Sequence, residues 1–157
     1  MASQEPVHAV IPYSDGQIIA GGEDFKLRLW DVATGALKMT FAGHSDIIMA
    51  IVALPDGTIV SAAQDNLIRR WKVDSQMSFR TYSGHSEMIN TLALSNDGQH
   101  LLSGSDDCTV KQWNVNAGSN TNALVKTYQM GNADAWVGAV CVLPNGNFIT
   151  ANGNSSL

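Results

Sequence analysis

Two stretches of the chain show the same landmarks in the same order: residues 43–73 (GHSDIIMAIVALPDGTIVSAAQDNLIRRWKV) and 84–115 (GHSEMINTLALSNDGQHLLSGSDDCTVKQWNV). Each begins with Gly-His, has Asp-Gly in its middle part and ends two residues after a Trp. The same landmarks recur earlier as Asp-Gly at 15–16 and as Trp30, so the period is 41 to 42 residues. A fixed period of this length indicates a repeat architecture.

Each unit alternates apolar segments with turn residues. In the second unit the apolar segments are 48–54, 58–62, 67–73 and 77–82. Short apolar runs bounded by Gly, Pro, Asn and Asp predict β-strands, and the frequent turns exclude helices. We label the four strands of a unit a, b, c and d. Strand a is almost wholly apolar, which predicts burial on both of its faces, whereas the later strands alternate.

The repeat resembles the WD40 family of β-propellers over residues 7–157. Two units carry the landmark residues of that family, which are the His of Gly-His, a Ser in strand b, an Asp in the next turn and a Trp in strand c. These residues are His44, Ser61, Asp65 and Trp71 in one unit and His85, Ser103, Asp107 and Trp113 in the next. The resemblance implies an all-β, WD40-type propeller of about 3.5 four-stranded antiparallel blades, an open part of a ring for which we expect seven.

The repeat divides the chain into four parts. Blade one covers residues 7–41, blade two 42–82, blade three 83–129 and an incomplete blade four 130–157. Gly57 precedes Trp71 by 14 residues, and the same step from Gly146 predicts a fourth Trp at position 160. We therefore expect the sequence to stop inside strand c of blade four and to be part of a longer protein.

His, Ser and Asp together are also the residues of a hydrolase triad, in which the hydroxyl is the nucleophile. In WD40 proteins the same residues form a hydrogen-bonded tetrad with the Trp, so that each buried polar group has a partner. Duplication favours the structural interpretation, because an enzyme needs one triad and a repeat fold needs one tetrad per blade. We predict no catalytic residue.

Blades one and four lack parts of the tetrad. In blade one, Ser3 and Ala20 stand where His and Ser are expected. Only Asp24 and Trp30 remain, so we expect this blade to lack the stabilisation of a tetrad. Blade four has Asn132, Thr150 and Asn154 at the corresponding positions and reaches no Trp. We expect no complete tetrad there either.

The resemblance implies that a partner binds the top face, whose rim is built from the d–a connections and the b–c turns. Residues just before each tetrad Asp and at the start of strand a point to this rim. The candidates are Glu23, Ile47, Met49, Gln64, Met88, Asn90, Asp106 and Trp136.

Trp136 is a candidate anchor, because large aromatic residues are frequent binding hot spots. The alternative is that an extra residue between Gly131 and Gly146 shifts Trp136 by one place and buries it against a neighbour. Ile47, Met49 and Met88 have a similar alternative, since all three lie close to a buried strand.

Charge restricts the class of partner. The formal net charge is −5, and the nine Lys and Arg are scattered except for Arg69-Arg70. This distribution argues against nucleic acid and favours a basic peptide or protein. The first residues do not resemble a signal peptide, and no apolar run approaches about 18 residues, so we predict no membrane insertion and a cytoplasmic or nuclear location.

Metal and cofactor sites are not predicted. His8, His44, His85 and His100 lie in different blades or strands, and Cys108 and Cys141 form neither a disulfide framework nor a zinc motif. No small-molecule substrate is indicated.

The leading hypothesis is a non-catalytic scaffold that binds proteins or peptides on its top face. An alternative is a targeting or regulatory propeller within a larger protein that carries a kinase, protease or NTPase switch domain. A third is a truncated copy without function. The sequence alone leaves these alternatives open.

Overall fold

The computed structural model describes residues 5–118, 123–130 and 135–153, and these form four separate antiparallel sheets. The first contains β1 (Val7–Ser14), β2 (Gln17–Gly22), β3 (Lys26–Asp31) and β4 (Leu37–Ala42). The second contains β5 (Ile48–Ala53), β6 (Ile59–Ala63), β7 (Ile68–Lys72) and β8 (Met77–Tyr82). The third contains β9 (Ile89–Leu94), β10 (His100–Ser105), β11 (Thr109–Asn114) and β12 (Leu124–Gln129), and the fourth contains β13 (Val137–Val142) and β14 (Phe148–Asn152).

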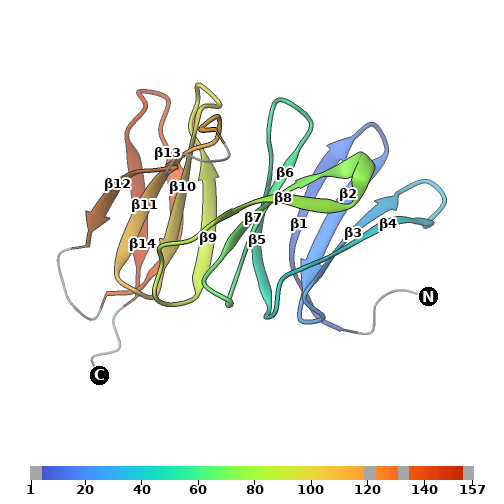
Figure 1. Ribbon diagram of the computed structural model, residues 1–157, viewed down its shortest axis with the longest axis horizontal. Helices are drawn as coiled ribbons and strands as arrows, with labels where there is room; N and C mark the ends of the chain where they lie inside the picture. Colours follow the sequence, from blue (N-terminus) through green and yellow to red (C-terminus); the bar gives the residue numbers. More distant parts are fainter. Residues whose placement is uncertain (1–4, 119–122, 131–134, 154–157) are drawn as a thin grey trace.

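Each sheet keeps the order of the chain, so consecutive strands within a blade pair directly. Three four-stranded sheets and one two-stranded sheet confirm the predicted all-β architecture. Figure 1 shows the first three sheets side by side in chain order from right to left, and the fourth sheet overlaps the third in this view. The a strands lie next to one another, because β5 contacts both β1 and β9, and β9 contacts β13.

The Asp-Gly landmark closes the hairpin between strands a and b. In blade two the Leu54 N–H donates to the carbonyl of Thr58 at 2.8 Å, and Asp56 Oδ1 accepts from the Thr58 N–H at 3.0 Å. Gly57 has a φ of 80°, in the left-handed region that favours glycine. The sequence therefore turns where the landmark predicts.

The hydrophobic core lies between the sheets. Phe41 in strand d of blade one meets Trp71 of blade two edge to face, with ring centroids 6.1 Å apart. Tyr82 of blade two meets Trp113 of blade three in the same way at 5.9 Å. Both Trp side chains are 1% exposed. Each of these blades therefore depends on its neighbour to bury its largest side chain.

Strand b, rather than strand a, is the buried strand. All of β6 and all but the first residue of β10 are buried, whereas β5 and β9 are mostly half-buried. The prediction that strand a is buried on both faces is therefore wrong. Strand b pairs with a strand on each side, whereas strand a is the inner edge of its sheet and pairs on one side only.

Strand c of blade four cannot be compared with its prediction, because residues 154–157 lie outside the described part of the chain. Helical structure in the described residues is limited to the 3₁₀ turn η1 (Val73–Ser75) between β7 and β8. No helix in these residues is long and apolar enough to cross a membrane.

Arg70 on β7 links blade two to blade three. Its guanidinium ion-pairs with Asp56, its Nε donates to Thr58 Oγ1 at 2.8 Å, and its Nη1 donates to the carbonyl of Val115 in blade three at 2.6 Å. The side chain is 8% exposed. In the sequence Arg70 was notable only as one of two adjacent cations, because its partner in the next blade is 45 residues away.

We expect Arg70→Met to lower the free energy of unfolding by about 1–3 kcal/mol, because the Val115 carbonyl loses its donor from blade two. Urea denaturation of the full chain measures this change. Lys72→Met is the matched control, since the Lys72 side chain is 63% exposed and should cost less than about 0.5 kcal/mol. Equal effects of the two substitutions would contradict the proposed link.

Candidate functional site

The four landmark residues of blade two form a continuous chain of hydrogen bonds. Trp71 Nε1–H donates to Ser61 Oγ, the Ser61 hydroxyl meets His44 Nε2, and His44 Nδ1 meets Asp65 Oδ2, with each bond 2.8 Å long. The ionised Asp65 carboxylate can only accept, which leaves Nε2 of a neutral imidazole as the acceptor of the Ser61 hydrogen. The imidazole N–H is then on Nδ1 and donates to Asp65.

Blade three repeats this arrangement. Trp113 Nε1 donates to Ser103 Oγ at 2.8 Å, and His85 lies 2.7 Å from both Ser103 Oγ and Asp107 Oδ2. Thr109 adds a hydroxyl donor to Asp107 Oδ1 at 2.6 Å. The structure thus brings together both predicted sets of four residues.

Both tetrad carboxylates are held in the ionised form. Burial raises the pKa of Asp107, but the hydrogen bonds from His85 and Thr109 lower it by more, so the pKa lies well below the ordinary carboxyl value. For Asp65, burial is likewise outweighed by the bonds from His44 and from the backbone of Ser45, and its pKa is also lowered.

These Ser-His-Asp sets are not arranged for nucleophilic attack. Ser61 and Ser103 are both 0% exposed, so no substrate reaches either hydroxyl. Each serine oxygen also accepts a hydrogen bond from an indole, which withdraws electron density from a nucleophile. The geometry fixes the b–c turn instead, because the Asp at that turn is tied through His and Ser to the Trp of strand c.

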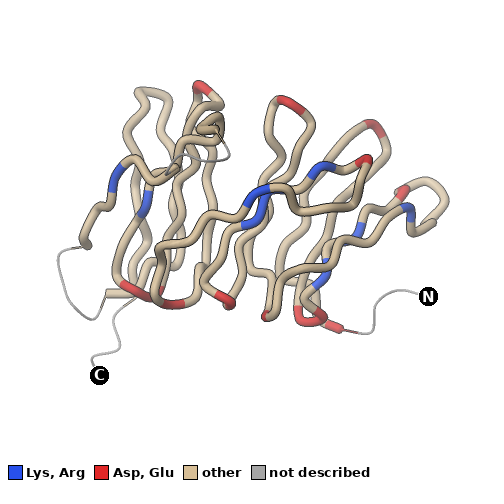
Figure 2. Tube along the Cα trace, viewed as in Figure 1, with Lys and Arg blue, Asp and Glu red and all other residues tan. Residues whose placement is uncertain are grey.

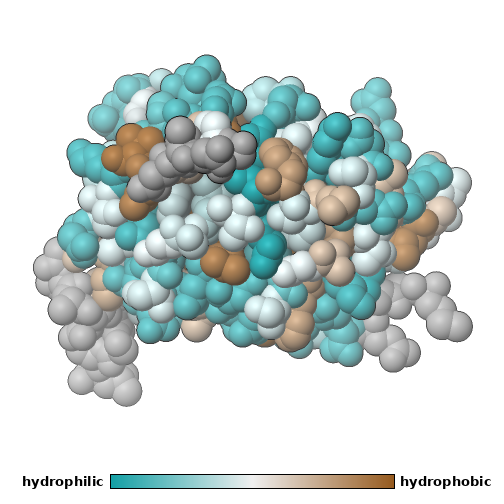
Figure 3. Space-filling model, viewed as in Figure 1, coloured by the Kyte–Doolittle hydropathy of each residue, from teal (hydrophilic) through white to brown (hydrophobic). Residues whose placement is uncertain are grey.

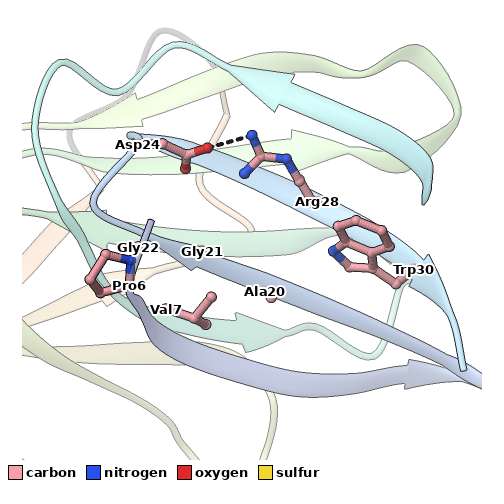
Figure 4. A pocket seen from close by; sticks show the side chains of 8 residues that line it. All are labelled: Pro6, Val7, Ala20, Gly21, Gly22, Asp24, Arg28 and Trp30. Atoms are coloured by element: carbon pink, nitrogen blue, oxygen red, sulfur yellow. Dashed lines mark ion pairs between the residues drawn. The ribbon is translucent and has the colours of Figure 1, made fainter. Parts of the chain in front are cut away.

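Blade one has an ion pair at the place of the tetrad Asp, which the sequence did not predict. Arg28 forms an ion pair with Asp24, with both side chains 19% exposed (Figure 4). Arg69 and Lys111, at the equivalent positions, instead contact a Thr of strand d, at 3.4 and 3.3 Å. Arg28 reaches Asp24 because no imidazole stands between them.

A shallow pocket lies beside this ion pair, and Figure 4 shows its lining. The residues around it are Pro6, Val7, Ala20, Gly21, Gly22, Asp24, Arg28 and Trp30. Ala20 replaces the tetrad Ser. Trp30 Nε1 consequently makes no hydrogen bond among the described residues. Ser3, the residue at the His position, lies outside the described part of the chain.

Blade four is described only in part at its tetrad positions. Asn132 and Asn154 lie outside the described residues. Thr150 Oγ1 lies 3.8 Å from Met130 Sδ, so its hydroxyl contacts a thioether at the position where Ser61 and Ser103 contact an imidazole.

The top-face candidates are positioned by one backbone hydrogen bond that recurs in every blade. The N–H of the residue before the tetrad Asp position donates to the carbonyl of a residue at the start of strand a. The four bonds are Glu23 to Pro6 (3.1 Å), Gln64 to Ile47 (2.9 Å), Asp106 to Met88 (3.1 Å) and Gly153 to Trp136 (2.9 Å). Trp136 therefore occupies the place of Ile47 and Met88, and the extra residue in blade four does not shift it.

A second contact recurs in blades one to three. The side chain two residues further along strand a contacts the side chain of the residue before the tetrad Asp position. His8 Nε2 lies 3.3 Å from Glu23 Oε1, Gln64 Nε2 donates to Met49 Sδ at 3.6 Å, and Asn90 Nδ2 donates to Asp106 Oδ1 at 2.6 Å. Two of these cross-turn pairs consist of predicted residues, namely Met49 with Gln64 and Asn90 with Asp106. The third joins the predicted Glu23 to His8.

Exposure differs along this row of residues. Ile47, Met49 and Met88 are half-buried, as are Glu23, Gln64, Asn90 and Asp106, whereas Trp136 is 42% exposed. Sequence reasoning missed Gly153, the blade-four equivalent of Asp106. Its position just before Asn154 was the available signal, but a residue without a side chain does not suggest a binding site.

Comparison with known proteins decides the family. The family model described as "WD domain, G-beta repeat" matches residues 2–31, 35–72 and 76–114. The chain belongs to the WD40 repeat family. WD40 domains generally act as interaction scaffolds and are usually non-catalytic.

One solved structure and one curated protein are similar to this chain. The WD40 β-propeller domain of Doa1, a crystal structure, is similar with a TM-score of 0.84 at 22% identity, over 98% of this chain and 50% of that chain. U3 small nucleolar RNA-associated protein 15 of Schizosaccharomyces pombe (strain 972) is 35% identical over 49 residues, which are 30% of this chain and 10% of that protein. The chain thus spans about half of the Doa1 chain and matches a tenth of the curated relative.

Charges are segregated in this WD40 chain. All nine Lys and Arg lie on strands c and d. Figure 2 shows Asp and Glu at the turns along both edges of the sheets, including the lower edge, where the b–c turns lie. The inner strands a and b therefore carry no Lys or Arg, so the inner part of the top face has only acidic and neutral side chains and His8. Among the described residues, no group of three or more His, Cys, Asp or Glu is placed to hold a metal ion.

We expect the tetrad of blade three to make stability depend on acid pH. The pKa of Asp107 is lowered in the folded state, so its contribution is complete above the ordinary carboxyl pKa of about 4 and is lost as the pH falls below that value. Asp107→Asn should cost about 1–3 kcal/mol at neutral pH and weaken the loss of stability between about pH 4 and pH 2.

Urea denaturation over a pH series measures both effects. Asp74→Asn is the control, because the Asp74 side chain is 71% exposed and its partner Lys72 is 63% exposed. If Asp107→Asn kept the pH dependence of the unsubstituted chain, the assignment of that dependence to the tetrad would be wrong.

Proposed function

We propose that this chain is a non-catalytic scaffold that binds a peptide or protein on its top face, and that the bound surface is basic. The observation that supports this most directly is the row of cross-turn pairs, which holds Glu23 and Asp106 at fixed positions on the same row as Met49, with Trp136 at the equivalent place in blade four. Fixed carboxylates next to apolar side chains suit a ligand that has both positive charge and apolar groups.

Charge on the inner strands supports the same choice. Because the Lys and Arg are confined to strands c and d, no Lys or Arg on strands a or b neutralises Glu23 or Asp106, and the basic side chain beside Glu23 is the imidazole of His8. The same distribution argues against nucleic acid, since phosphate contacts require cations grouped along one surface. The known relative with a small nucleolar RNA-associated name matches too small a share of this chain to alter the proposal.

The outer side of the blades is a weaker candidate for binding. Its exposed apolar residues are Leu37, Met77, Phe79 and Val125 on the d strands. On the side seen in Figure 3, where β8 lies in front, the apolar residues form small separate patches. Isolated apolar residues are normal on a protein surface, whereas interaction sites are marked by contiguous apolar patches.

The test is quantitative capture of proteins from cell extract on the immobilised full chain. Met49→Ala combined with Met88→Ala should reduce the captured partners at least about fivefold, because both side chains line the top face. Val32→Ala combined with Met77→Ala is the matched control on the opposite edge, where these residues are 60% and 67% exposed. Capture should also fall as the salt is raised from about 0.05 M to about 0.5 M.

Two outcomes would contradict the proposal. Capture that is equally sensitive to both double variants would show that the top face is not the site. Partners that remain bound at high salt would show that the bound surface is not selected by its charge.

A further inference from the structure

Trp136 lies on a surface made of two glycines. A Cβ atom added to Gly138 would lie 2.6 Å from Cζ3 of the indole, and a Cβ added to Gly153 would overlap its Cε2, Cζ2 and Nε1 atoms. Neither glycine has a positive φ, so only the indole excludes a side chain at these positions. We call Trp136, Gly138 and Gly153 the Trp136 platform.

The platform replaces the cross-turn pair of the other blades. Gly138 corresponds to Asn90 and Gly153 to Asp106, so blade four has no side chains where blade three has a hydrogen-bonded pair. The indole fills that space and packs closely against the backbones of both glycines. Trp136 is still 42% exposed, so part of this residue remains open to solvent.

A carboxylate is fixed next to the platform. Asn90 Nδ2 donates one hydrogen to Asp106 Oδ1 at 2.6 Å and the other to the carbonyl of Val137 at 3.0 Å, directly after Trp136 in the chain. One amide group thus joins the b–c turn of blade three to strand a of blade four. Asp106 Oδ2 makes no hydrogen bond among the described residues, and it remains an acceptor on the top face.

We infer that the Trp136 platform and Asp106 bind an arginine side chain of the partner protein. A planar guanidinium stacks on the exposed part of the indole, and its N–H groups donate to the Asp106 carboxylate. This inference rests on the proposed function, because it assigns the chemistry of one position on the same top face.

Other side chains fit this arrangement less well. An acidic group is repelled by Asp106 and finds no cation on strands a or b. A neutral aliphatic group gains contact with the ring but leaves the carboxylate without a partner. Lysine supplies the charge, but it lacks the plane that stacks on an indole and the paired donors that match a carboxylate.

The experiment is a titration of the ¹⁵N-labelled full chain with acetyl-Gly-Arg-Gly-amide, followed through the indole N–H signals in NMR spectra. The Trp136 signal should shift and saturate. Trp71 and Trp113 are internal references, because their indole groups donate to buried serines. The same peptide with lysine should bind about threefold more weakly, and the peptide with norleucine at least about tenfold more weakly.

Two variants test the two parts of the site. Trp136→Met introduces the residue that blade three has at this position, and it should weaken the arginine peptide at least about fivefold, measured through the backbone amide signals of Gly138 and Gly153 because the indole reporter is lost. Asp106→Asn removes the charge but keeps an oxygen that accepts from Asn90, and it should weaken binding about twofold to fivefold. Unchanged Trp71 and Trp113 indole signals show that each variant is folded.

The inference is overturned if the norleucine peptide binds as well as the arginine peptide, if the arginine peptide leaves the Trp136 signal unmoved, or if Asp106→Asn binds as the unsubstituted chain does. These outcomes are separate from failure of the proposed function. Capture that still depends on Met49 and Met88 supports the scaffold even without an arginine site, whereas capture independent of the top face rejects the scaffold whatever the peptides do.

Discussion

The hydrogen bond from the strand-c Trp to the strand-b Ser is the interaction on which the rest of blades two and three depends. It holds the serine hydroxyl in the direction of His44 or His85, and the imidazole then reaches the Asp of the b–c turn. The residue before that Asp is consequently fixed at the rim. A chain of polar contacts inside each blade therefore determines where Gln64 and Asp106 stand on the outside, and the indole that starts this chain also fills the contact with the preceding blade.

Blade one shows that the Asp of the b–c turn can be held by more than one kind of polar contact. Without His and Ser, the turn carboxylate of Asp24 is neutralised by Arg28. The equivalent residues of the other blades, Arg69 and Lys111, contact a Thr of strand d instead. The ion pair holds the turn, and Glu23 keeps its backbone bond to Pro6. What is lost is the partner of the Trp30 indole, so blade one has a pocket at the place where blades two and three are filled.

The top face combines a constant backbone with variable side chains. The same turn-to-strand hydrogen bond recurs in four blades, but the residues across it change from His8 with Glu23 to Met49 with Gln64, to Asn90 with Asp106, and finally to two glycines under Trp136. Such a face presents a different chemical group at each blade at a fixed spacing. This is a suitable design for recognising an extended partner, because specificity follows from the order of the groups.

The sequence by itself determined the fold class and the order of strands, because a 41- to 42-residue period shows which residues are equivalent. The membership of both tetrads followed from the resemblance to the WD40 family, and the structure brings both sets of residues together. The same resemblance predicted the top-face positions, whose role in binding is part of the proposed function. The sequence did not reveal the ion pair of Arg28 with Asp24, the reach of Arg70 to Val115, or the greater burial of strand b, and it left the place of Trp136 open. Those features depend on contacts in three dimensions and on the space that a missing side chain leaves. A repeat pattern in the sequence specifies neither of them. Only the tertiary structure decided them, because packing between sheets fixes which polar groups find partners and which surfaces remain open.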